Sequence, residues 1–330
     1  MPASRPSAAA AAASLERHQV ACYLGAIAVA AAAGVLAPQT FSSLSVLITP
    51  FLAALLYVTF LQVPVAAMGR AMRGGRFLGA VLVLNFVVVP LVVAALFALV
   101  PSERGVQLGV LLVLLCPCVD YVIVFTGLAG GDERRLLAAT PVLLVVQMAL
   151  LPLYLWAFLG RELTAVVQVR PFLEAFAVLI VLPLLLAWAT QWWARRTRAG
   201  RRAESGATVA MVPLMMAVLF TVVASQLPRL DGWPTGLGTV AGIYALFAVA
   251  MTIFGVVTAR GLGLDTRGRR AVVFSGVTRN SLVVLPLALA LPGPLAPAAA
   301  SVVVLQTLIE LVAMVVLVRL VPRLVPGPVG

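Results

Sequence analysis

The stretch LLCPCVDYVIVFTGLAGGD, from Leu114 to Asp132, decides the fold expected for this chain. It is apolar enough to lie in a lipid bilayer, yet it contains a proline, two cysteines and the carboxylate of Asp120. A charged side chain at the bilayer centre costs about 2.5–3.5 kcal/mol on insertion scales, and such residues usually mark functional sites. Proline removes a backbone donor, which is tolerated at this depth only where the chain faces protein or a cavity. The stretch therefore predicts a broken membrane helix.

A second stretch has the same character. FSGVTRNSLVVLPLALALP, from Phe274 to Pro292, places Arg279 and Asn280 in the middle of an apolar run. Broken helices that meet near the bilayer midplane form the substrate and ion sites of many secondary transporters. We therefore expect the two stretches to cross, with Asp120 and Arg279 facing one water-accessible cavity.

The composition of the whole chain is that of an integral membrane protein. The 330 residues are 63% hydrophobic and 10% charged, with a mean hydropathy of +1.12. Apolar runs recur along the whole length and leave no room for a soluble catalytic domain. The sequence contains no Walker-type glycine loop, H-E-x-x-H or G-x-S-x-G motif. We therefore expect neither an enzyme nor ATP-driven pumping, and no cofactor.

The apolar runs each have about the length that crosses ~30 Å of hydrocarbon. They predict an all-α integral membrane protein with ten transmembrane helices, preceded by a disordered cytoplasmic tail over residues 1–19. The expected spans are 20–37, 43–64, 77–100, 106–130, 136–160, 171–194, 206–227, 236–258, 271–292 and 297–318.

The basic residues, all 23 of them arginines, give the expected orientation. With both chain ends in the cytoplasm, 18 arginines fall in cytoplasmic segments, Arg279 falls within a span, and four fall on the opposite side of the membrane: Arg104, Arg161, Arg170 and Arg229. This bias follows the positive-inside rule and explains the net charge of +12 without nucleic acid as a partner. We expect a multi-pass protein of the bacterial plasma (inner) membrane with both termini in the cytoplasm.

Five spans followed by five spans require any internal repeat to be inverted in the membrane. The expected repeats cover residues 20–160 and 161–330, with the fourth and ninth helices broken and crossing. LLVVQMALL around Gln147 is similar to SVVVLQTLIEL around Gln306, and the same offset of 159 residues relates Asp120 to Arg279.

Several polar residues of the two stretches are candidates for a substrate or ion site. Asp120 and Arg279 form either a midplane charge pair that changes during transport or a structural ion pair between helices. Asn280, Ser281 and Thr126 either offer ligands and hydrogen bonds to a solute or bond neighbouring helices to one another.

The other candidates are two thiols and a second carboxylate. Cys116 and Cys118 flank the proline, where a thiol either binds a soft, thiophilic ion or serves as a small apolar residue. Two thiols do not make a closed zinc site, so no resident metal is expected. Glu310 lies inside the last span and is either a proton carrier or a glutamate that reaches the cytoplasmic surface.

These motifs resemble the bile acid/sodium symporter superfamily, and most strongly its arsenical-resistance branch, the arsenite efflux permeases. That branch carries a cysteine in its fourth span and, 14 residues later, the end of a G-D or G-N motif. Cys118 and Asp132 in PCVDYVIVFTGLAGGD match this spacing. RNSLVVLPLALALP resembles the family's ninth span, where an asparagine, here Asn280, opens the second break.

The resemblance implies a core of spans 3–5 and 8–10 that moves against a panel of spans 1, 2, 6 and 7. It also implies export of trivalent arsenic, as arsenite with antimonite as a further candidate, in exchange for protons. In that activity Cys118 binds the metalloid transiently and Cys116 assists. Asp120 is then the proton-linked group whose charge Arg279 balances, with Glu310 as a further proton carrier.

Two positions depart from the family's pattern. The arsenite permeases carry a glutamate just after the ninth-span asparagine, where this chain has Ser281-Leu282-Val283. The sodium-coupled branch carries a glutamate and a glutamine where this chain has Ser275 and Arg279. A fixed positive charge thus stands where a sodium ion is expected, which argues against sodium coupling. The alternative function is transport of a small organic anion bound by Arg279.

Overall fold

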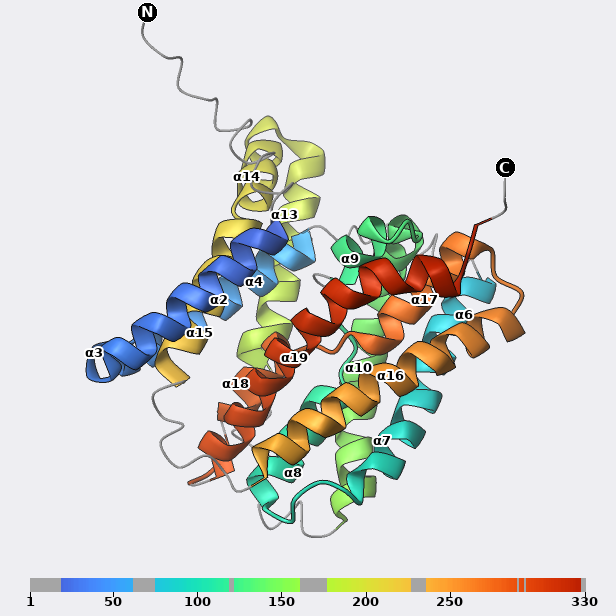
Figure 1. Cartoon of the computed structure of the whole chain (residues 1–330). Coiled ribbons are helices and arrows are strands. Elements are labelled where there is room, and N and C mark those ends of the chain that lie inside the picture. Colours follow the sequence, from blue (N-terminus) through green and yellow to red (C-terminus); the bar gives the residue numbers. More distant parts are fainter. Residues whose placement is uncertain are drawn as a thin grey trace, which may run out of the picture. The chain divides into compact units, whose positions relative to one another are not determined.

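The computed structural model of this chain describes residues 19–61, 75–118, 122–160, 177–226, 236–289, 291–293 and 295–327. Within these ranges the chain is helical apart from turns and short breaks, and it forms no strand (Figure 1). The prediction of an all-helical protein is confirmed. The predicted tail, except for Gln19, and the predicted site residue Asp120 lie outside the described residues.

The chain divides into two compact units, each built from segments that are far apart in the sequence. Unit 1 joins Met1–Pro64 to Glu174–Gly232, and unit 2 joins Val65–Leu173 to Trp233–Gly330. Both stretches singled out in the sequence belong to unit 2.

Unit 1 is a bundle in which α15 packs along α2 and α4, and α13 packs on α4. Gln191 of α13 donates Nε2 hydrogen bonds to the carbonyls of Phe60 and Leu61, at 3.2 and 3.0 Å, and so ties α13 to the end of α4. The elements are α2 (Gln19–Leu36), α3 (Pro38–Ser42), the 3-10 helix η1 (Ser43–Leu47), α4 (Ile48–Leu61), the π-helix η3 (Ala177–Val181), α13 (Leu182–Arg196), α14 (Arg198–Val209) and α15 (Met211–Gln226).

Unit 2 is organised around its last helix, α19, which packs on α8, α16 and α18, while α17 packs along α16 (Figure 1). Tyr244 of α16 donates a 3.0 Å hydrogen bond to the carbonyl of Val302 on α19. The elements are α6 (Gly75–Val83), the π-helix η2 (Leu84–Val88), α7 (Val89–Phe97), α8 (Arg104–Leu114), α9 (Val122–Leu128), α10 (Glu133–Leu159), α16 (Leu237–Gly261), α17 (Thr266–Val277), α18 (Ser281–Leu289) and α19 (Leu295–Leu324).

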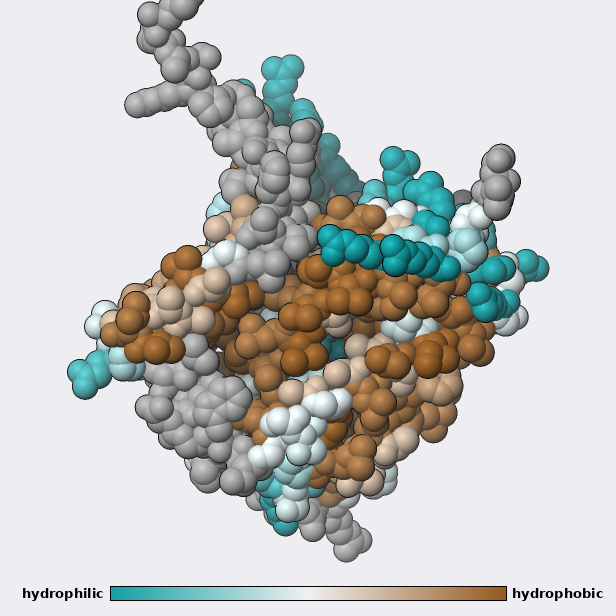
Figure 2. Space-filling model, viewed as in Figure 1, coloured by the Kyte–Doolittle hydropathy of each residue, from teal (hydrophilic) through white to brown (hydrophobic). Residues whose placement is uncertain are grey.

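The outward faces of these helices are hydrophobic, as expected for surfaces in contact with lipid. Figure 2 shows apolar side chains over the visible sides of α16 and α19, and Val249, Ile253 and Val257 on α16 are all more than half exposed. Four helices in the described ranges are long and apolar enough to cross a membrane, or six if two bent pairs are each one span. The chain is an integral membrane protein; ten spans in inverted repeats stay a prediction.

Two segments that the sequence analysis left between spans are helical. Residues 38–42 form α3, which starts with Pro38 in its first turn, where proline's missing N–H has no partner to lose. Residues 198–205, between the predicted spans, belong to α14, which extends to Val209 inside the predicted span 206–227 and whose alanines and arginines favour a helix. Neither segment was identified because neither is apolar enough to give a span signal.

Candidate functional site

The first stretch breaks at its proline. Helix α8 ends at Leu114, the chain runs non-helically through Cys118, and α9 begins at Val122. The amide of Cys116 makes only a 3.4 Å bond to the carbonyl of Val113, and Pro117 has no N–H to continue the ladder. Backbone groups of this segment therefore need hydrogen-bond partners from elsewhere in the fold.

The second stretch breaks at Thr278. Helix α17 ends at Val277 and α18 begins at Ser281. Asn280 caps the new helix, because its Oδ1 accepts a 3.1 Å hydrogen bond from the amide of Val283. The sequence resemblance pointed to an asparagine at this break, and capping of α18 gives it a physical role.

The two breaks cross and pair with each other. Pro117 and Arg279 form an isolated antiparallel bridge. On either side of it, the amide of Asn280 donates to the carbonyl of Cys116 at 2.8 Å, and the amide of Cys118 donates to the carbonyl of Thr278 at 3.3 Å. Each break thus supplies the partners that the other lacks.

Arg279 lies at this crossing with its side chain completely buried. Its Nη2 donates to Asn85 Oδ1 at 2.7 Å and to the carbonyls of Ser275 and Gly276 at 2.7 and 2.8 Å. Its Nη1 donates to the carbonyl of Leu114 at 3.3 Å. Protein oxygens from three separate segments therefore surround the guanidinium.

Asn85 is a site residue that the sequence analysis missed. It is fully buried in the π-helix η2, and π-helical turns occur often at functional sites. Its Nδ2 donates to the carbonyl of Val81 and to Ser275 Oγ, both at 2.9 Å, which turns Oδ1 toward Arg279. The available signal was a lone asparagine inside the apolar run VLVLNFVVVP.

Glu310 reaches the same crossing from α19. Its Oε2 accepts a 2.7 Å hydrogen bond from the backbone amide of Arg279 and a further hydrogen bond from Gln306 Nε2. The side chain is 3% exposed, so it is buried against the second break and does not extend to the membrane surface. This burial favours the proton-carrier role, which stays a prediction.

The two predicted thiols flank the crossing proline. Cys116 and Cys118 are reduced, and their exposed fractions are 0% and 1%. Ser281 accepts a 2.8 Å hydrogen bond from Thr307 of α19. Thr126 is buried on α9, and among the described residues its Oγ1 has no hydrogen-bond partner. No group of three or more His, Cys, Asp and Glu side chains within the described ranges is arranged to hold a metal ion.

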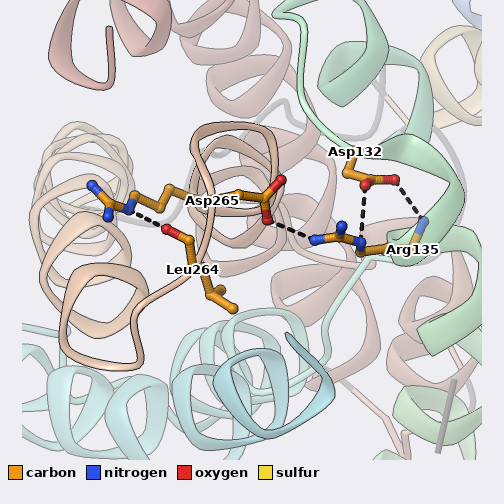
Figure 3. Close-up of polar contacts among 5 residues, drawn as sticks. Asp132, Arg135, Leu264 and Asp265 are labelled. Atoms are coloured by element: carbon orange, nitrogen blue, oxygen red, sulfur yellow. Dashed lines mark hydrogen bonds and ion pairs between the residues drawn. The ribbon is translucent and has the colours of Figure 1, made fainter. Parts of the chain in front are cut away.

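A second polar cluster fixes the start of α10, at the end of the first stretch (Figure 3). Asp132 accepts a 3.0 Å hydrogen bond from the amide of Arg135, which makes it the N-cap of α10, and its carboxylate lies 3.1 Å from Arg135 Nε. Arg135 also donates to Asp265, at 2.6 Å, just before α17 begins. Arg135 thus links the start of α10, which follows the first break in the sequence, to the start of α17, which precedes the second.

Asp132→Ala should destabilise the protein more than Asp265→Ala. Both changes remove a carboxylate bonded to Arg135. Only Asp132 also makes a side-chain capping hydrogen bond, which contributes about 0.5–2 kcal/mol, whereas Asp265, at the N-cap of α17, makes none. The Arg135–Asp265 pair is half exposed, and exposed pairs contribute about 0.2–1 kcal/mol. Thermal unfolding of the two purified variants measures the difference; equal losses contradict the cap.

Comparison with known proteins places the chain in a family. Residues 49–230, more than half of the chain, match the Sodium Bile acid symporter family. The matched range includes the first break but ends before the second. No curated protein matches the chain in a comparison of sequences. The chain is thus a member of the Sodium Bile acid symporter family, whose members are transporters and not enzymes.

Proposed function

We propose that this transporter exports trivalent arsenic, as neutral arsenite, in exchange for protons. The observation that supports this proposal is the position of Cys116 and Cys118. Both thiols are buried beside Pro117, where the two broken helices cross. Thiols at an opened backbone inside a membrane protein are suited to a soft, small and uncharged solute.

The chemistry of trivalent arsenic fits this position. Each As–S bond forms as a thiol replaces one hydroxyl of arsenite, and the thiol proton leaves with that hydroxyl as water. The reverse step with water releases the solute, so no oxidant or reductant is needed. Thr126 Oγ1 and Asn280 Nδ2 are buried and lack hydrogen-bond partners among the described residues, and they supply polar contacts for the remaining hydroxyls.

Proton exchange requires a carboxylate near the solute path. Glu310 contacts the second break directly through the amide of Arg279. Protonation of its Oε2 would remove an acceptor of that amide and so change the geometry of the crossing. Asp120 is the second proposed proton carrier and lies outside the described residues.

The alternative substrate, a small organic anion, requires Arg279 to present donors to a carboxylate. The guanidinium instead donates to four oxygens of the described residues, at 2.7–3.3 Å. An anion has to displace these contacts, whereas a thiophilic solute does not. This geometry favours the thiol-based proposal.

Uptake of arsenite by everted membrane vesicles tests the proposal. Vesicles containing the protein should accumulate arsenite when an inside-acidic proton gradient is imposed. Cys118→Ser should lower this uptake at least about tenfold, since loss of a direct ligand costs at least as much as the ~10-fold loss typical of supporting residues.

Cys22→Ser is the matched control, because Cys22 lies on α2 in unit 1 and is neither buried nor part of the crossing. It should transport as the unmodified protein does. Arsenite uptake that is unchanged in Cys118→Ser, or that is absent from vesicles with normally folded protein, contradicts the proposal.

A further inference from the structure

The guanidinium of Arg279 occupies a cage of oxygen atoms that has the chemistry of a cation site. Among the described residues, its acceptors are three backbone carbonyls, of Leu114, Ser275 and Gly276, and the Oδ1 of Asn85. Such a set of neutral oxygens is the ligand type that hard metal cations take from proteins. Phe247 adds a ring whose centre lies 5.6 Å from Arg279 Cζ, a distance at which a cation is attracted.

The carbonyls of this cage come from the ends of two half-helices. Leu114 is the last residue of α8, and Ser275 and Gly276 lie in the last turn of α17. Helix C-termini carry a partial negative charge. In secondary transporters, the C-terminal ends of half-helices and unwound carbonyls bind the coupling cation. Here the C-terminal ends of α8 and α17 converge on the guanidinium of Arg279, a positive group that belongs to the chain itself.

The orientation of Asn85 is fixed independently of Arg279. Its Nδ2 is held by Val81 and Ser275, so Oδ1 points into the cage whatever occupies it. The cage is therefore built by α6, η2, α8 and α17, and the arginine enters it from the second break.

We propose that Arg279 is a tethered cation that replaces the coupling ion in this member of a sodium symporter family. The unmodified protein transports without sodium, because its cation position is permanently filled. Shortening the arginine opens a site for a free monovalent cation, either guanidinium or a metal ion such as sodium. The proposal depends on membership of the transporter family but not on the identity of the solute.

Thermal unfolding of purified Arg279→Ala in choline buffer tests the site directly. Without a cation, the variant should unfold at a lower temperature than the unmodified protein. Addition of about 10 mM guanidinium, far below denaturing concentrations, or of sodium should raise its Tm by about 2–4 °C. The unmodified protein and Arg319→Ala, which removes an exposed arginine of α19, should show no such rise.

A second variant and a second readout cover the case in which Arg279→Ala folds poorly. The yield of monodisperse protein after extraction with and without guanidinium then replaces Tm, and guanidinium should increase it. Arg279→Lys keeps a tethered charge and should not respond to either cation. Equal behaviour of the alanine and lysine variants, or no cation response in the alanine variant, overturns the proposal.

The same experiment separates this proposal from the proposed substrate. Cation-dependent stability is measured without arsenite, so it holds or fails independently of arsenite uptake. A rise in the Tm of the unmodified protein with sodium, or solute uptake by it that stops when choline replaces sodium, also overturns the tethered-cation proposal.

Discussion

Gly109→Val should strongly destabilise the protein, because α8 and α19 approach each other closely at this residue. A Cβ on Gly109 would overlap Val302 Cγ2 and lie 2.6 Å from the backbone oxygen of Ala299. Backbone atoms do not rotate away as a side chain does, so α8 has to shift against α19. Overpacking of this kind costs about 1–3 kcal/mol and occasionally more, and we expect the upper end.

The effect extends to the crossing, since α8 ends at Leu114, whose carbonyl accepts a hydrogen bond from Arg279. Gly105, one turn earlier, is also close to α19, although less so: a Cβ there would lie 2.7 Å from Ala298 Cβ. The two glycines form a G-x-x-x-G pattern, which lets membrane helices approach at their backbones.

Gly242→Val is the matched control for Gly109→Val. Gly242 is an exposed residue in the interior of α16, and a Cβ there would have no atom within 4 Å. The yield and Tm of the purified proteins compare the two variants. Similar values for both would show that helix contact at Gly109 does not limit stability.

Replacement of Glu310 should separate its structural role from its proposed role in proton exchange. Glu310→Ala leaves the buried backbone amide of Arg279 and the Gln306 amide without their acceptor. Hydrogen bonds to charged groups contribute about 1.5–3 kcal/mol, so this variant should be unstable. Glu310→Gln keeps an acceptor oxygen but cannot carry a proton, and it should fold while losing proton-driven uptake.

Three measurements distinguish the outcomes for Glu310. These are the Tm of each variant, arsenite uptake with a proton gradient, and arsenite exchange without one. Glu310→Gln should retain exchange while losing at least about a hundredfold in gradient-driven uptake, the lower end of what a positioned proton-transfer group contributes. Gradient-driven uptake that survives in a folded Glu310→Gln assigns Glu310 to structure alone.

The breaks at Pro117 and Thr278 were accessible to sequence reasoning for a local reason. A proline without an amide donor and polar groups inside an apolar run cannot form an ordinary membrane helix, whatever surrounds them. The crossing followed from the same need, because each break lacks hydrogen-bond partners that the other has. Asn85 was missed because the partners that make it a site residue, Ser275 and Arg279, lie 190 and 194 positions away in the sequence.

The sequence by itself determined that this is a membrane-embedded helical protein with two interrupted helices, since hydropathy and proline act through nearby residues. Only the tertiary structure decided which residues surround the two interruptions and bond to Arg279. Arg279 meets Asn85, 194 positions away, and its amide meets Glu310, 31 positions away. A buried charge takes whichever oxygen atoms the folded helices bring to it, and sequence spacing does not specify that set.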